Sequence, residues 1–178
     1  YSKESLERLE KISEDLYTAY FRQQEEQEMF LPRLPEQLGG KKFILGTHQV
    51  EAINKWVEND RIGILELATG SGKTITALAA ATQLYQDASE LILIVTVPYV
   101  DLAKQWVENL KQFNMNPLQC WGSQAKWLNE FKRKITNLRY GVSSFVSIVV
   151  VNRTLTGEAF QSCLSQLDQT KVMLIGDE

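Results

Sequence analysis

The chain has 178 residues, of which 23% are charged and 44% hydrophobic, and it contains ten Gly, four Pro and two Cys. This composition excludes disordered, collagen-like and disulfide-scaffold proteins, and the length fits one ordinary domain with a small appendage. Neither a run of 18 apolar residues nor a secretory signal is present, and Cys120 and Cys163 stand apart from each other and from the single His. We therefore expect a cytoplasmic protein with no membrane span and no zinc site. Because the first residue is not Met, we also expect a piece of a larger protein.

The net charge of −3 is unevenly distributed. Residues 1–30 hold eight acids and four bases, a net charge of −4, so residues 31–178 sum to +1. Between residues 126 and 139, five bases face one acid. Such a basic stripe is typical of a nucleic-acid binder, but a solvated helix face explains it equally well.

Residues 2–28 lack Gly and Pro and carry apolar side chains at steps of three and four. This spacing predicts a long amphipathic helix, and such a stripe normally packs on a neighbouring element. Pro32 and Pro35 end the helix, and Gly39-Gly40 indicates a hinge. We place a boundary between a helical extension, residues 1–35, and a second domain, residues 36–178.

The second domain alternates predicted helices and strands. Thr47 is expected to cap a helix over 47–59 that directs Val50, Ile53, Trp56 and Val57 inward. The remaining pattern predicts strands at 62–67, 91–97, 118–121, 145–151 and 171–175, and helices at 72–86, 100–113, 123–138 and 157–167. This alternation predicts an α/β fold with a doubly wound, mainly parallel sheet.

The segment from Leu67 to Thr74 reads LATGSGKT and lies between a predicted strand and a predicted helix. A glycine-rich turn at this position directs backbone N–H groups inward, and the following helix adds its positive N-terminal end. Lys73 could reach the β- and γ-phosphates of a nucleotide, and the Thr74 hydroxyl suits Mg²⁺. The candidate phosphate-binding residues are Thr69, Gly70, Ser71, Gly72, Lys73 and Thr74.

The last predicted strand ends in Asp177-Glu178, 104 residues after Lys73. In a parallel sheet, functional side chains gather beyond the carboxyl ends of the strands. Asp177 could hold Mg²⁺ together with Thr74, and Glu178 could orient and deprotonate an attacking water. We expect Lys73 and Glu178 to be the catalytic residues and a nucleotide with Mg²⁺ to be the cofactors; the resemblance described next implies that the nucleotide is ATP.

On these motifs the sequence resembles superfamily 2 helicases and translocases. The similarity is to their first RecA-like, P-loop NTPase domain, in the branch that holds restriction-enzyme translocase subunits and excision-repair helicases. The stretch LGTHQ, residues 45–49, is similar to the segment upstream of the phosphate loop in that branch. The resemblance implies that Gln49, 24 positions before Lys73, reads the adenine edge. His48 we interpret as a packing residue or a local hydrogen-bond partner.

Two further segments resemble parts of these helicases that touch nucleic acid. The stretch VPYVDL, followed by Gln105-Trp106, is similar to motif Ia, and VVVNRTL is similar to a segment that contacts the tracking strand. The resemblance makes Pro98, Tyr99, Arg153 and Thr154 candidate nucleic-acid contacts. Core packing is the expected task of Trp106. Asp177-Glu178 matches the first half of motif II, at which the domain is cut short, so DEAD and DEAH forms remain open.

The resemblance implies an ATP-dependent nucleic-acid helicase or translocase of a restriction or repair system. It favours DNA as the partner and leaves RNA open. Hydrolysis in such proteins requires a second RecA-like domain of the same chain, so this portion alone is expected to be poorly active. An upstream nuclease domain would suit a restriction-like parent. The alternatives are another P-loop ATPase and a nucleotide-gated protein-interaction lobe.

Overall fold

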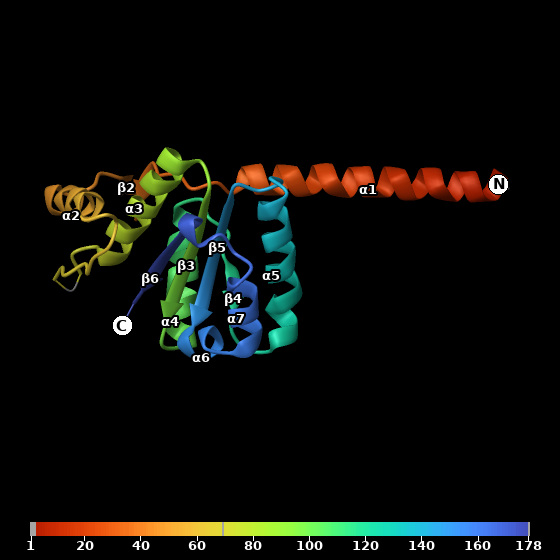
Figure 1. The fold of residues 1–178 in the computed structure, drawn as a ribbon. Coiled ribbons are helices and arrows are strands. Elements are labelled where there is room, and N and C mark those ends of the chain that lie inside the picture. Colours follow the sequence, from red (N-terminus) through yellow and green to blue (C-terminus); the bar gives the residue numbers. More distant parts are fainter. Residues whose placement is uncertain (1–2, 69, 178) are drawn as a thin grey trace.

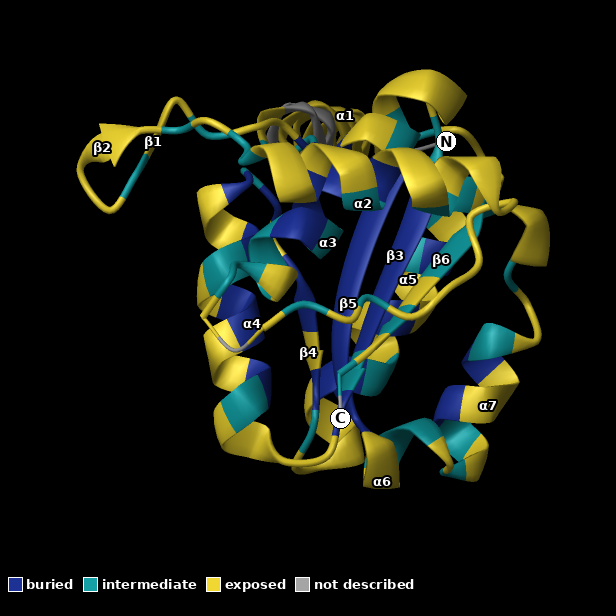
Figure 2. Ribbon diagram, turned by 90° about the vertical axis from the view of Figure 1, so that its left-hand side faces the viewer, coloured by how far each residue is buried: buried dark blue, intermediate teal, exposed yellow. Residues whose placement is uncertain are grey.

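A computed structural model describes residues 3–68 and 70–177, the side chains of residues 23–28 excepted. Four strands form a parallel sheet in the order β4-β5-β3-β6. Their bounds are β3 Leu91–Val97, β4 Leu118–Cys120, β5 Phe145–Val151 and β6 Val172–Gly176. The two central strands, β3 and β5, consist mainly of Leu, Ile and Val and are buried except at half-buried Thr96 (Figure 2), as parallel strands covered on both faces should be.

Helices follow the strands in alternation, so the predicted α/β fold with a parallel sheet is confirmed. The helices of this part of the chain are α2 Thr47–Glu58, α3 Lys73–Ala88, α4 Val100–Gln112, α5 Gln124–Arg139, α6 Asn152–Leu155 and α7 Glu158–Leu164. A single 3₁₀ turn, Gln169–Lys171, leads into β6. The short helix α6 was not predicted, since four residues carry too little periodicity to be recognised.

The sheet separates two hydrophobic cores. In β3, Leu91, Leu93, Val95 and Val97 face a core built with α2, α3 and α4. The alternate residues Ile92 and Ile94 face a second core built with α5 and α7. Helices therefore cover both faces of the sheet, which is the doubly wound arrangement.

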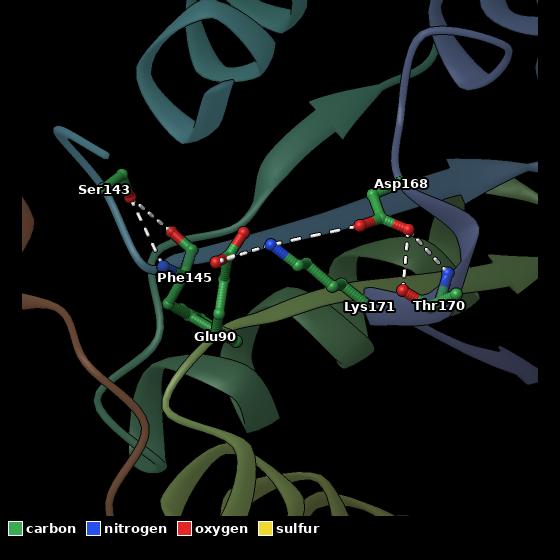
Figure 3. A network of polar contacts seen from close by, with 6 residues as sticks. All are labelled: Glu90, Ser143, Phe145, Asp168, Thr170 and Lys171. Carbon is green, nitrogen blue, oxygen red and sulfur yellow. Dashed lines mark hydrogen bonds and ion pairs between the residues drawn. The ribbon is translucent and has the colours of Figure 1, made fainter. Parts of the chain in front are cut away.

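An ion pair joins the amino ends of β3 and β6 (Figure 3). Lys171, just before β6, donates to the Glu90 carboxylate, just before β3, at 2.8 Å, and lies 3.9 Å from Asp168. Asp168 in turn accepts hydrogen bonds from the hydroxyl and the backbone N–H of Thr170. These contacts fasten the edge strand β6 at the point where it enters the sheet.

Helix α1, Lys3–Met29, confirms the predicted long helix and extends away from the sheet as a single rod (Figure 1). The expectation that its apolar stripe packs on a neighbour was wrong. The exposed fractions of Leu6, Leu9, Ile12 and Leu16 are 49–66%, because this part of the helix projects away from the body and does not contact it. Asn114 holds the end of the helix by donating to the carbonyl oxygens of Met29 and Leu31, each at 2.9 Å. In the described residues, no helix is both long enough and apolar enough to cross a bilayer.

Two details of the segment between α1 and α3 differ from the predictions. Gly39-Gly40, interpreted as a hinge, forms the turn of a small antiparallel hairpin between β1 Gln37–Leu38 and β2 Lys41–Lys42. Both glycines have positive φ, 58° and 76°, as such a hairpin turn requires.

Helix α2 differs from its prediction at its cap and along its buried face. It is capped by Gly46 rather than Thr47, and its buried residues are Gln49 and Ile53. Val50 and Val57, expected to point inward, are exposed, because the stripe facing the body is centred on Gln49.

The predicted strand at residues 62–67 is absent, and this prediction was wrong. The segment is irregular, with Ile62 72% and Ile64 90% exposed. A run of strand-forming residues becomes a strand only where a neighbour supplies backbone partners. In the described residues β6 pairs with β3 alone, and no strand pairs with residues 62–67.

Candidate functional site

The carboxyl ends of three strands are tied together at Thr96, near the end of β3. Its carbonyl oxygen accepts a hydrogen bond from the Asp177 N–H at 3.0 Å, immediately after β6. Its hydroxyl donates to the Asn152 side chain at 2.6 Å, immediately after β5. Residues from three distant parts of the sequence therefore meet at one edge of the sheet.

The four candidate nucleic-acid contacts lie at this edge. Pro98 and Tyr99 follow β3, and Arg153 and Thr154 follow β5, the adjacent strand in the sheet. Pro98, Tyr99 and Arg153 are exposed and Thr154 is half-buried. The structure thus brings together two segments that lie more than 50 residues apart in the sequence.

The glycine-rich turn leads directly into α3. Gly70 and Gly72 have φ angles of 79° and 86°, the left-handed region that only glycine adopts without strain. Gly72 caps α3, and the helical ladder begins where the Thr76 N–H donates to the Gly72 carbonyl oxygen at 2.9 Å. The N–H groups of the first turn are therefore not used by the helix and point out of its end.

Lys73 and Thr74 form the first turn of α3. The Lys73 side chain is exposed and Thr74 is half-buried. Within the described residues, no carboxylate lies within ion-pair distance of the Lys73 ammonium group. None of the described carboxylates therefore competes with an anion for this amine at the helix N-terminus.

The connection from α3 to β3 places the start of α3. Only Ser89 and Glu90 separate the end of α3 from the start of β3, so the helix runs back along the strand. A 16-residue helix and a seven-residue strand are both roughly 23–24 Å long. The first turn of α3 therefore lies toward the carboxyl end of β3.

Asp177 faces the side of the sheet that α3 and α4 cover. Its carboxylate accepts a hydrogen bond of 2.7 Å from the indole Nε1–H of Trp106 on α4. Met173 and Ile175, which precede it at steps of two in β6, also pack against the core beneath α3 and α4. The end of β6 and the segment leading into α3 lie on the same side of the sheet (Figure 1).

Gln49 links the start of α2 to the phosphate loop. Its Oε1 accepts from the Gly46 N–H at 2.9 Å, and its Nε2 donates to the Thr76 hydroxyl at 3.0 Å and to the Gly72 carbonyl oxygen at 3.3 Å. The side chain is only 8% exposed, unlike a surface glutamine. A Cβ on Gly72 would lie 2.8 Å from Gln49 Nε2, so a larger residue there would displace the Gln49 amide from these hydrogen bonds.

His48 adds a second link between α2 and the loop. Its Nε2 lies 3.1 Å from the Ser71 carbonyl oxygen, which bears out the expected local hydrogen bond. The Ser71 hydroxyl donates to the Ala68 carbonyl oxygen at 2.6 Å and closes the turn. The loop is therefore held by contacts from α2 and by its own side chain.

A cavity of about 290 Å³ opens beside the loop. This volume is just below the roughly 300–1,000 Å³ range of small-molecule sites. The cavity is lined by Leu38, Lys42, Phe43, Ile44, Gln49, Gly70, Ser71, Gly72 and Ile75. Phe43 also contacts Phe113 edge-to-face at a ring distance of 5.9 Å, so its ring is anchored in the core while it forms part of the wall.

Three predictions need separate mention. Thr69 and Glu178 lie outside the described residues. The basic run of residues 126–139 lies on α5, where Trp127, Phe131 and Ile135 pack inward and four of the five bases are exposed. Helix α5 covers the face of the sheet opposite α3 and α4, away from the glycine-rich turn.

Sequence reasoning missed four residues of this region. Trp106 packs in the core as expected, but its contact with Asp177 was not foreseen, and neither were Thr96, Lys42 and Phe43. A buried indole N–H normally finds a partner, which was the one available signal for Trp106. The identity of the atom that accepts the indole hydrogen bond depends on how α4 packs across the end of β6, which the sequence alone does not show.

The parallel sheet, its two helical layers and the glycine-rich turn at the start of α3 define a RecA-like domain of the P-loop class. The family model for the type III restriction enzyme, res subunit, matches residues 42–178. The chain belongs to this family, so it is a helicase-type ATP-binding domain of the kind found in restriction systems. A comparison with curated proteins found no match.

Proposed function

We propose that this chain is the first ATP-binding domain of a DNA translocase or helicase. One observation carries the proposal: the glycine-rich turn and Asp177 lie on the same face of the sheet, toward the carboxyl ends of its strands. In parallel α/β proteins this edge is where ligands bind.

The triphosphate of ATP would lie against the first turn of α3. The unused N–H groups of the turn and the helix dipole favour an anion there. Lys73 adds a charge that no carboxylate of the described residues neutralises. We propose Gly70 to Thr74, together with Thr69, as the phosphate-binding residues.

The donor set fits Mg²⁺. Thr74 and Asp177 offer a hydroxyl and a carboxylate, and the described residues contain no cluster of three metal-ligating side chains. Magnesium is usually held by one or two protein oxygens together with substrate phosphates and water, rather than by a complete protein cage. When bound, the ion would neutralise charge on the β- and γ-phosphates. Glu178 we propose as the residue that orients and deprotonates the attacking water.

The base would occupy the cavity beside the loop. Phe43 offers an apolar ring surface, and Gln49 offers an amide that can donate and accept at the adenine edge. Both ends of that amide already bond to Gly46, Gly72 and Thr76. Oε1 accepts only the Gly46 N–H and keeps a second lone pair for the adenine amino group, whereas an adenine nitrogen that accepts from Nε2 would replace one of its two existing bonds.

Nucleic acid would cross the carboxyl edge at Pro98, Tyr99, Arg153 and Thr154. We favour DNA as the nucleic acid because the family is that of a restriction-enzyme subunit.

We further propose that a second RecA-like domain of the parent protein completes the catalytic site, so that this chain alone binds nucleotide weakly and turns it over slowly. The proposal of an upstream nuclease domain rests on family analogy alone.

Cys120 and Cys163 are buried and form no disulfide, which suits the reducing environment of the cytoplasm. We therefore propose a cytoplasmic location.

The test compares Lys73→Ala with Lys111→Ala in the 178-residue chain. Lys111 is a surface lysine paired with Glu108 at 2.7 Å near the end of α4, so it controls for the loss of one positive charge. Binding of a fluorescent ATP analogue with Mg²⁺ should weaken at least tenfold in Lys73→Ala and stay unchanged in Lys111→Ala. ATP turnover by the same samples should be slow in all three proteins. Equal nucleotide affinity of wild type and Lys73→Ala would overturn the assignment.

A further inference from the structure

Two tryptophans of the chain are buried to the same degree but differ in their hydrogen bonding. Trp106 and Trp127 are each 3% exposed. The indole N–H of Trp106 donates to Asp177 Oδ2 at 2.7 Å, whereas that of Trp127 finds no partner in the described residues. The two indoles therefore form a matched pair, of which only Trp106 hydrogen-bonds to Asp177.

The contact holds Asp177 from a second direction. The Asp177 N–H already donates to the Thr96 carbonyl oxygen at 3.0 Å, which continues the pairing of β6 with β3 by one residue. The indole then holds one carboxylate oxygen from α4, 71 residues earlier in the chain. With backbone and side chain both held, the carboxylate has a fixed orientation.

A hydrogen bond to a carboxylate is short and strong, and it leaves acceptor capacity on both oxygens. Trp106 is anchored in turn by the core that α4 shares with α3 and the sheet. The orientation of Asp177 is therefore coupled to the packing of the helix that follows β3.

We propose that Trp106 is the positioning residue of Asp177. Its indole N–H holds one carboxylate oxygen and leaves the other for the magnesium ion of the bound nucleotide. This inference rests on the nucleotide-binding function proposed above. Trp106 touches neither phosphate nor metal and acts only through Asp177. Groups that hydrogen-bond to metal ligands fix their orientation, and their loss typically lowers metal affinity by 10–100-fold.

The experiment compares Trp106→Phe with Trp127→Phe in the 178-residue chain. Both changes remove an indole N–H and part of a ring from a site of equal burial, but only one breaks a bond to Asp177. Binding of Mn²⁺, in place of Mg²⁺, is measured by electron paramagnetic resonance in the presence of a non-hydrolysable ATP analogue. Affinity for the analogue alone is measured in EDTA.

We expect Trp106→Phe to weaken Mn²⁺ binding by roughly tenfold and to leave metal-free nucleotide affinity unchanged. Trp127→Phe should change neither quantity. Equal Mn²⁺ affinity of the two variants would overturn the inference while leaving the nucleotide site intact. A wild-type chain without metal-dependent nucleotide binding would overturn the proposed function, and this inference with it.

A second measurement covers the case in which Trp106→Phe fails to fold. In ¹H–¹⁵N spectra of the chain, Asp177→Asn should shift the indole N–H signal of Trp106 and leave that of Trp127 in place. Addition of Mn²⁺ with the nucleotide analogue to the wild type should broaden the Trp106 indole signal before that of Trp127. An unmoved Trp106 signal in Asp177→Asn, or equal broadening of the two signals, would overturn the inference.

Discussion

At the scale of single residues, the phosphate loop depends on two glycines that face different surroundings. Gly70 and Gly72 share a left-handed backbone, with φ of 79° and 86°. A Cβ at Gly70 would meet no heavy atom within 4 Å, whereas one at Gly72 would lie 2.8 Å from Gln49 Nε2. The first glycine is needed for its conformation, and the second for its conformation and its lack of a side chain.

Gly70→Ala should therefore lower the free energy of unfolding by roughly 1–2 kcal/mol, the cost of a left-handed alanine. Gly72→Ala should cost about 1–3 kcal/mol more, because Gln49 must give up buried hydrogen bonds to make room. Urea unfolding of both variants and the wild type measures the difference. Equal losses would show that Gln49 moves aside freely.

The buried cysteines are a second feature at this scale. Burial is the main reason that the pKa values of the Cys120 and Cys163 thiols are raised, and both side chains pack in the core beneath α5 and α7. Because the thiolate is the reactive form, both thiols should resist iodoacetamide in the native chain and react after unfolding. Mass spectrometry before and after addition of urea measures the modification, and rapid labelling of the native protein would contradict this expectation.

At the scale of elements, β6 is the strand most dependent on its ends. It pairs with β3 on one edge, and Leu174 in its centre is 60% exposed. Its amino end is fastened by Lys171, Glu90 and Asp168, and its carboxyl end by Thr96 and Trp106. The strand that presents Asp177 is thus held at both ends more than in its middle.

The amino-end contacts give a pH dependence. The side-chain hydrogen bond from Thr170, more than the charge of Lys171, holds the pKa of Asp168 below its ordinary value of 3.8. A lowered carboxyl pKa stabilises the folded chain above pH 3.8 and loses this effect as pH falls through the folded-state value. Asp168→Asn should therefore be less stable than the wild type at pH 7, and the gap should close toward pH 2. Thermal unfolding between pH 2 and 7 measures it, and a gap independent of pH would exclude the carboxylate as its source.

At the scale of the whole molecule, the chain consists of a parallel-sheet body and a projecting helix. Among the side chains that the structure describes, none from helix α1 belongs to the buried part of either core, and Asn114 contacts the last residue of the helix. The body should therefore fold without it.

Deletion of residues 1–28 should leave the thermal midpoint of the body unchanged, because none of the side chains described in this segment belongs to either core. The helical signal in circular dichroism should fall in proportion to the helix removed. Asn114→Ala is the matched control for the tether, since it removes the contacts of 2.9 Å to Met29 and Leu31 and leaves the helix present. A large drop in midpoint on deletion would show that α1 supports the body.

The sequence by itself determined the features that depend on neighbours along the chain. The runs LILIVTV and FVSIVVV predict buried parallel strands, the alternation predicts the doubly wound fold, and Gly-Ser-Gly-Lys-Thr before an alanine-rich stretch predicts an anion site at a helix start. Local propensity and periodicity suffice for these. They do not suffice for residues 62–67, whose strand-like composition finds no partner strand in the described residues.

Only the tertiary structure decided what each side chain meets. Asp177 faces the side of the sheet covered by α3, and its carboxylate accepts a hydrogen bond from Trp106. The Gln49 amide is hydrogen-bonded to Gly72 and Thr76, and the apolar stripe of α1 is exposed. The contact of Asp177 depends on how α4 packs across the end of β6, and the exposure of the apolar stripe depends on the direction in which α1 projects from the body. Such contacts join residues 23 to 85 positions apart, and no periodicity in the sequence encodes their register.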